Sequence, residues 1–168
     1  MSANDATSLI ERVQSSYKKL SEAAATLNSA SDELGESISA LDAALKKLNL
    51  GVTAWVTIVG GNDDCSLYYW SRDVGYDKIG GKWGIAISTS TGYLDRPDEE
   101  SCDSWLFSDA PRAYRIEAID KIPDLIEKLI DEASSVTNRI IEKTAEAKQL
   151  AEAIAPSPQP RRNRVATN

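Results

Sequence analysis

The sequence contains no histidine, and this absence excludes more chemistry than any other feature of the composition. Without an imidazole the chain has no Ser-His or Cys-His nucleophile pair and no histidine-ligated metal site. Its two cysteines, Cys65 and Cys102, do not form the paired C-x-x-C motif of structural zinc sites. A glycine-rich phosphate cradle of the G-x-G-x-x-G or P-loop kind is also missing. The composition favours a protein that is not an enzyme and that uses no cofactor.

Long apolar runs are scarce, since no stretch approaches the roughly 20 residues that a membrane-spanning helix requires. The first residues lack the basic segment and apolar core of an export signal. We therefore expect a soluble cytoplasmic protein with reduced cysteines. Basic residues are outnumbered, with 19 Lys and Arg against 26 Asp and Glu, which gives a net charge of −7. This balance disfavours direct binding to nucleic acid or to an anionic membrane.

The chain does contain a long heptad repeat, which occupies its first third. The e and g positions beside the repeat are mostly small and uncharged, whereas parallel dimers usually carry Glu and Lys there. The pattern predicts one long helix within residues 1–50 that packs closely on another helix. Counting Ile10 as position a, the a positions are Ile10, Tyr17, Ala24, Ser31, Ile38 and Leu45, and the d positions are Val13, Leu20, Leu27, Leu34, Leu41 and Leu48.

A second periodic stretch occupies residues 119–154 and nearly matches the first in length. Proline is not tolerated in a helix interior, so Pro123 predicts a kink or a fresh helix start near Asp120. A shorter segment, residues 110–119, predicts a separate short helix. With an even number of strands between them, the two long helices would lie antiparallel and bring both termini together. The predicted fold is α+β, a long antiparallel helical hairpin forming a coiled-coil-like stalk with an inserted β head.

Between the helices the pattern changes from helical to alternating. Residues 52–59, 67–74, 82–89 and 105–108 are rich in β-branched and aromatic side chains and are separated by glycine-rich turns. They predict a four-stranded antiparallel sheet. The expected domains are an N-terminal long helix (1–50), a β head (51–109), a short helix and then a C-terminal long helix packing on the first (110–154), and a disordered tail rich in Pro and Arg (155–168).

The stretch DRPDEESCDS, residues 95–104, contains five acids and almost nothing apolar. Strand counting places it in a loop at one tip of the head, beside the loop of residues 60–66 and opposite the stalk. Because Cys65 and Cys102 belong to these two loops, they are candidates for neighbours. The acids predicted to gather at this tip are Asp63, Asp64, Asp95, Asp98, Glu99, Glu100 and Asp103, with Arg96 as the one cation among them.

Several interpretations of the acidic tip stay open. Carboxylates and thiolates together are potential metal ligands, and two carboxylates in different environments can divide acid and base roles in a divalent-cation-dependent enzyme. A solvated loop that keeps the protein soluble is an equally simple explanation. We predict a recognition surface for a larger, basic-surfaced protein such as a nucleic-acid-handling enzyme, which the acids would inhibit by occlusion. A purely structural coiled-coil adaptor is the alternative.

The predicted sheet has no cleanly polar face. Val52, Ala54 and Val56 share one face of the first strand, and Trp55 lies on the other. The short helix of residues 110–119 can cover only one of the two faces. The other face must meet a loop, a second protomer or a partner. We therefore count Trp55 among the partner-binding residues and expect a homo-oligomer formed through the helices or the sheet face.

Overall fold

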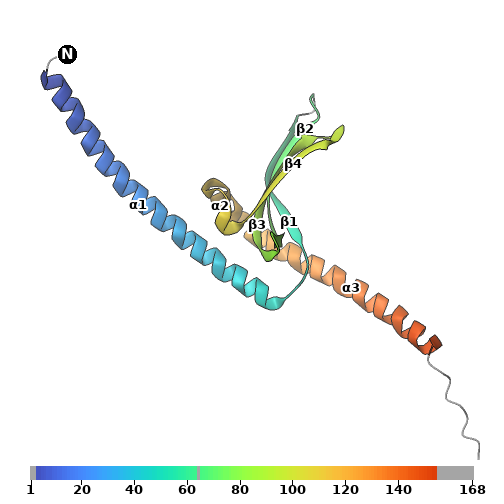
Figure 1. The fold of residues 1–168 in the computed structure, drawn as a ribbon. Helices are drawn as coiled ribbons and strands as arrows, with labels where there is room; N and C mark the ends of the chain where they lie inside the picture. The colour runs from blue at the N-terminus through green and yellow to red at the C-terminus, as the bar shows by residue number, and fades with distance from the viewer. Residues whose placement is uncertain (1–2, 64, 155–168) are drawn as a thin grey trace, which may run out of the picture.

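The computed structural model describes residues 3–63 and 65–154, and it shows a small β head between two long helices (Figure 1). The α+β class predicted from the sequence is confirmed. The tail predicted to be disordered, residues 155–168, lies outside the described residues. In chain order the elements are α1 (Ala3–Leu48), β1 (Ala54–Asp63), β2 (Tyr68–Ile79), β3 (Lys82–Tyr93), β4 (Arg96–Leu106), η1 (Phe107–Asp109), α2 (Arg112–Ala118), η2 (Ile119–Lys121) and α3 (Ile122–Ile154).

The four strands form the predicted antiparallel sheet, and their order in it is β1-β2-β3-β4. The strands are longer than expected, and the largest difference from the prediction is in β4. It covers Arg96–Leu106, so the stretch predicted to be an acidic loop is an edge strand. Its ladder with β3 continues to the pair of Thr91 and Ser101, and Tyr93 pairs with Arg96 at the turn. As an edge strand β4 has one neighbour only, and its residues 96–104 are exposed on both faces of the sheet, so this stretch needs no alternation of apolar side chains.

The core of the protein lies between one face of the sheet and the helices. Val74 and Ile87 on this face are fully buried, as is Leu125 of α3. The chain turns from α2 into α3 through η2, and Pro123 lies in the first turn of α3, where its missing N–H costs no hydrogen bond. The expected fresh start near Asp120 is therefore confirmed.

The C-terminal third of α1 is fastened to this core. Ile38 and Leu45 are buried there. Asp42 Oδ1 accepts a hydrogen bond of 2.9 Å from the backbone N–H of Ile85, a residue of β3 that lies just outside the ladder with β4. Two arginines of α2 form hydrogen bonds to the middle of α1. They are Arg112, which donates to Asn28 Oδ1 at 2.9 Å, and Arg115, which donates to Ser31 Oγ at 3.2 Å.

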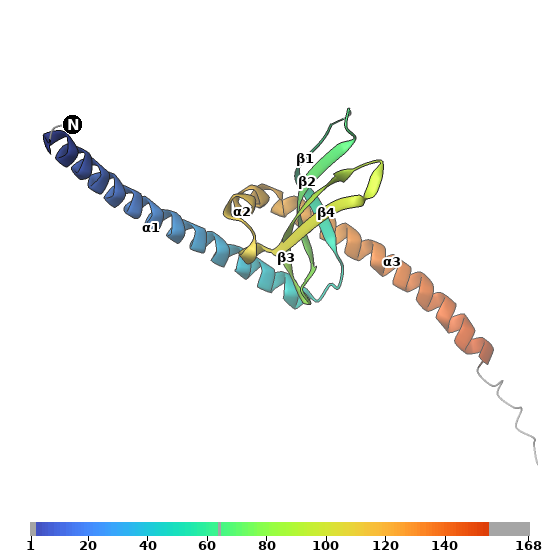
Figure 2. The same cartoon turned by 45° about the horizontal axis from the view of Figure 1, so that its top comes forward.

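The predicted helical hairpin is not confirmed. Beyond the core, α1 and α3 point away from each other, and their outer ends lie at opposite ends of the molecule (Figures 1 and 2). As a result, the apolar residues of the two periodic stretches that lie outside the core are exposed to solvent. The exposed fraction is 65% for Leu20 and 60% for Ile140. The heptad pattern identified the apolar face of each helix correctly, but a periodic pattern does not specify which element covers that face. Within residues 3–63 and 65–154, no helix combines the length and apolar content needed to cross a bilayer.

Candidate functional site

The face of the sheet turned away from the helices carries the most chemically distinctive group of side chains, and Trp55 is at its centre. Trp55 of β1 pairs with Gly75 of β2. A Cβ atom added at Gly75 would lie 2.3 Å from two carbons of the Trp55 ring, so the indole rests directly on the backbone of β2. Glycine is required here for that close approach. The aromatic ring is thereby held against the open face of the sheet, half-buried.

Two carboxylates on β2, Asp73 and Asp77, stand on either side of Gly75 and share this face. Each one accepts two hydrogen bonds from uncharged side-chain donors, and Asp77 accepts a third from the backbone N–H of Lys78 at 2.6 Å. These bonds orient the carboxylates but do not neutralise their negative charge. The side-chain donors are Thr53 Oγ1 (3.0 Å) and Trp55 Nε1 (3.2 Å) for Asp77, and Thr57 Oγ1 (2.6 Å) and Ser71 Oγ (2.7 Å) for Asp73.

A cluster of hydroxyls around one thiol continues the face across β3 and β4. Ser88, which is only 7% exposed, accepts a hydrogen bond from Ser104 Oγ at 3.0 Å, and its single hydroxyl proton can be donated either to the backbone carbonyl of Asp103, 3.2 Å away, or to the sulfur of Cys102. Its Oγ also lies 3.2 Å from the sulfur of Cys102. Hydrogen bonds from Ser88, and then from Ser90 and Ser104, lower the pKa of the Cys102 thiol against the opposing effect of burial. The cluster therefore favours the thiolate.

Together these groups surround an open cleft of about 350 Å³. We call this surface the open-face cleft. An indole beside two oriented carboxylates attracts an organic cation, because the ring face has a negative electrostatic potential and the carboxylates carry negative charge. The cleft is lined by Trp55, Asp73, Asp77, Ser88, Ser90, Cys102 and Ser104.

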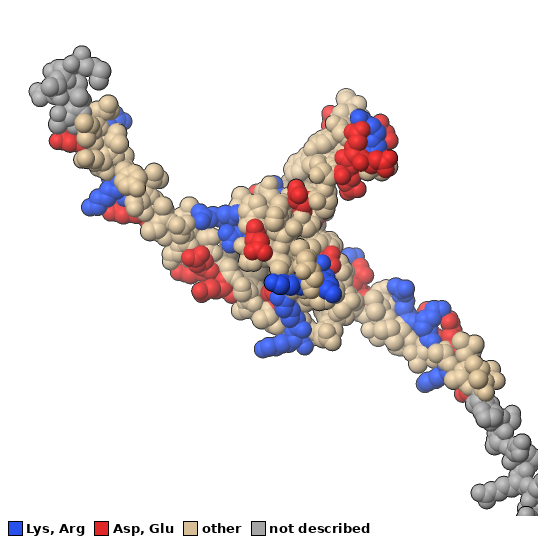
Figure 3. Space-filling model, in the orientation of Figure 1, with Lys and Arg blue, Asp and Glu red and all other residues tan. Residues whose placement is uncertain are grey.

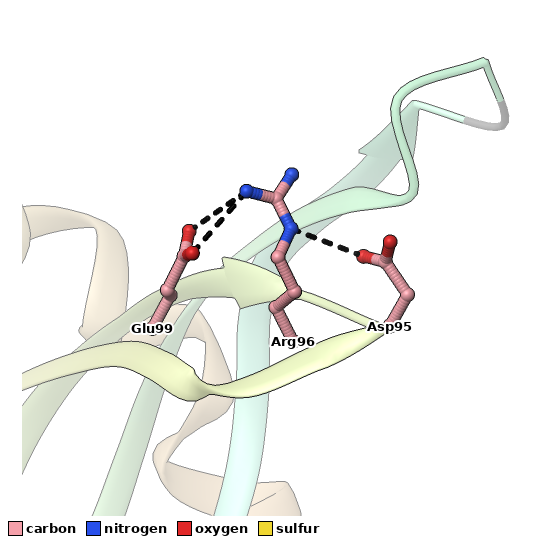
Figure 4. Close-up of polar contacts among 3 residues, drawn as sticks. All are labelled: Asp95, Arg96 and Glu99. Carbon is pink, nitrogen blue, oxygen red and sulfur yellow. Dashed lines mark hydrogen bonds and ion pairs between the residues drawn. The ribbon is translucent and has the colours of Figure 1, made fainter.

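Acidic side chains form a red patch at the end of the head away from the helices (Figure 3), and β4 carries Asp98, Glu99, Glu100 and Asp103. Some of these carboxylates have an ion-pair or hydrogen-bond partner, and others have none among the residues that the structure describes. Arg96 lies between Asp95, in the turn before β4, and Glu99 of β4, with Nε 3.7 Å from Asp95 and Nη1 3.1 Å from Glu99 (Figure 4). Glu100 interacts with the Tyr69 hydroxyl, and burial together with this carboxylate raises the pKa of Tyr69. Asp98 and Asp103 are exposed, so the predicted acidic surface exists, but with part of its charge compensated.

The remaining predicted site residues lie apart from the cleft. Asp63 accepts hydrogen bonds from Ser66 Oγ at 2.6 Å and from the Cys65 backbone N–H at 3.1 Å, which lower its pKa and order the turn after β1. Asp64 lies outside the described residues.

The two cysteines are not neighbours. Cys102 pairs with Ser90, whereas Cys65 lies beyond the pair of Tyr68 and Tyr93, so roughly 10 Å or more of sheet separates them. Both thiols are free and exposed.

Sequence reasoning identified Trp55 but missed its surroundings, because the polar residues of the second and third strands were not assigned to a face. Asp73 and Asp77 alternate with Gly75, and Ser88 and Ser90 follow the same period in the next strand. Extending the alternation from Trp55 through the meander would have placed all of them on one face.

Among the described residues, no group of three or more Cys, Asp or Glu side chains is placed to hold a metal ion. The acids of β4 are instead spread along an extended strand. Comparisons of the chain with protein-family models, with curated proteins and with solved structures give no significant match.

Proposed function

We propose that the protein is a non-enzymatic protein-binding module whose open-face cleft takes up a basic side chain of a larger partner. The observation that carries this proposal is the Trp55 indole held beside Asp73 and Asp77, two carboxylates oriented by uncharged donors only. Their donors are hydroxyls, an indole N–H and a backbone N–H, none of which carries a positive charge. A cation placed over the ring would neutralise the two carboxylates.

Arginine suits the cleft better than lysine. A guanidinium is planar, so it stacks on an indole and still directs N–H groups sideways to carboxylates. The cation–π contact contributes about 0.5–2 kcal/mol, and each hydrogen bond to a charged group about 1.5–3 kcal/mol. The open volume of about 350 Å³ is ample for one such side chain. We therefore expect one arginine of the partner to be the anchor.

The acids of β4 would act earlier, during the encounter. They project from the end of the head away from the helices (Figure 3), where a negative field steers a basic surface toward the cleft. A nucleic-acid-handling enzyme presents such a basic surface in its channel. There the acids would take the place of phosphates, and the head would block the channel by occlusion.

The test is a titration of the isotopically labelled full chain with three peptides of equal length, rich in arginine, lysine or glutamate, followed by NMR. The indole resonance of Trp55 and the amide resonances of Asp73 and Ser88 should shift with the arginine peptide, less with the lysine peptide, and not with the glutamate peptide. The affinity should fall as salt is raised from about 50 to 300 mM, because salt screens the attraction.

A matched pair of variants separates the cleft from net charge. Asp73→Asn combined with Asp77→Asn removes two charges in the cleft and keeps the shape of both side chains. Asp131→Asn combined with Glu142→Gln removes two exposed charges on α3. The first variant should weaken binding of the arginine peptide at least tenfold and the second less than twofold. Equal weakening by both, or equal shifts with the glutamate peptide, would show that the cleft is not a cation site.

A further inference from the structure

The outer half of α1 carries an apolar surface that the rest of the chain leaves uncovered. Its heptad positions before Asn28 all lie outside the core, and every residue from 8 to 27 is exposed. We call this surface the outer seam. It consists of Ile10, Val13, Tyr17, Leu20, Ala24 and Leu27, of which the five larger side chains are exposed by 57%, 58%, 72%, 65% and 51% in that order.

The accessible surface of the whole molecule is far larger than that of a folded monomer. It measures 12801 Å² for a chain of 18.3 kDa, whereas the usual scaling gives about 8,100 Å². Discounting about 2,700 Å² for the residues outside the described ranges, at the extended-chain value, still leaves an excess of roughly 2,000 Å². A standard interface needs only about 800 Å² from each partner. The protein therefore has surplus surface of the size that a stable dimer buries.

We propose that a second copy of the chain covers the outer seam by pairing the two α1 helices antiparallel. In antiparallel coiled coils an a position packs against a d position of the other helix. Placing Tyr17 against Leu20 of the second copy also places Val13 against Ala24, and Ile10 against Leu27. All six seam residues are used, and a twofold axis between residues 18 and 19 relates the helices. The surface is thus complementary to itself, as a symmetric dimer requires.

The positions beside the outer seam permit this pairing. Neighbours across the interface would be Ser16 and Ala23 on one side, and Gln14 and Ser21 on the other. None of these side chains is charged, so no like charges meet, and the small ones allow the two backbones to approach closely.

Charge selects the antiparallel orientation over the parallel one. Each chain carries a net charge of −7, and a parallel pair would set two acidic heads side by side. The antiparallel pair places the heads at opposite ends, because α2 docks on α1 at Asn28 and so fixes where each head begins. The two Asn28 residues would be about 28 Å apart along the helix axis. This is about three times the Debye length of roughly 8–10 Å, so the heads would repel each other little.

The first test is the mass of the full chain in solution, measured by sedimentation equilibrium. The wild type should have twice the monomer mass of 18.3 kDa. Leu20→Glu puts two charges at the centre of the interface and should raise the dissociation constant at least about 100-fold. Ser15→Glu adds the same charge on the opposite side of α1 and should change it less than threefold. Circular dichroism and tryptophan fluorescence of both variants establish that the head is folded.

The second test fixes orientation and register by disulfide formation in a Cys65→Ser/Cys102→Ser background. Ile10→Cys and Leu27→Cys are made as separate chains. In the antiparallel register neither chain cross-links with itself, but a mixture of the two does. In a parallel pair each chain cross-links alone, because identical positions face each other.

Some results would overturn the proposal. These are a monomer at about 100 µM, a dimer unaffected by Leu20→Glu, and cross-linking of either single-cysteine chain with itself. A dimer that dissociates only on Ile140→Glu would place the contact on α3 and refute it equally.

Discussion

The position of α1 in the fold predicts that two leucines of one helix differ several-fold in their contribution to stability. Leu45 is 7% exposed and lies in the core, whereas Leu20 is 65% exposed. Leucine to alanine removes three carbons, worth about 0.8 kcal/mol each when fully buried. Scaled by burial, Leu45→Ala loses roughly 2.2 kcal/mol plus the cost of the cavity, for a total of about 3 kcal/mol. Leu20→Ala loses about 0.8 kcal/mol at most.

Urea unfolding followed by tryptophan fluorescence is the assay, because Trp55, Trp70, Trp83 and Trp105 all lie in the head. With a slope near 2 kcal/mol/M, Leu45→Ala should lower the midpoint by roughly 1.5 M and Leu20→Ala by less than about 0.4 M. The series is repeated at several protein concentrations so that dissociation of a dimer is separated from unfolding of the head. If Leu20→Ala costs as much as Leu45→Ala in the monomer, the outer seam is buried within one chain and this reasoning is wrong.

Two further predictions concern the open face. Gly75→Ala should lower the free energy of unfolding by about 1–3 kcal/mol and shift the Trp55 emission, because its Cβ would lie 2.3 Å from the ring and 2.7 Å from the Ala54 carbonyl. Gly35→Ala, the control in α1, meets no atom closer than 4.0 Å and should stabilise by about 0.5–1 kcal/mol, so an equal loss in both would contradict the close contact. Hydrogen bonds from Ser88, Ser90 and Ser104 lower the pKa of Cys102, so alkylation of this thiol in a Cys65→Ser chain should begin at a lower pH than in the same chain carrying Ser88→Ala. Unchanged pH profiles of the alkylation rate would show that Ser88 does not stabilise the thiolate.

The sequence predicted the local elements well and their assembly less well. Alternation and glycine-rich turns are local properties, so the four strands and their antiparallel arrangement followed from the sequence, whereas their order comes from the structure. The break at Pro123 is also local, since it depends on one missing N–H. The hairpin failed because it depended on a partner for each helix. Ile38 and Leu20 occupy the same seam, yet the head buries the first and leaves the second exposed.

The candidate site also depends on contacts between distant segments, which local patterns do not predict. Trp55 stood out by residue type, but its surroundings come from three other strands. Asp73, Ser88 and Ser104 belong to one group only because the register of two ladders places them in one row. Register depends on the turns and on a bulge between Thr57 and Val59, neither of which the alternating pattern determines.

The acids of β4 have a consequence that does not depend on any partner. β4 is an outer strand of an open sheet, with one side of its backbone unpaired along Arg96–Leu106. Such an edge is a template on which the same strand from another molecule can add, and repeated addition leads to aggregation. Like charges repel across such a junction, and Pro97 removes a donor that it would need. Neutralising Asp98, Glu99, Glu100 and Asp103 would therefore leave β4 prone to pair with the same strand of another molecule.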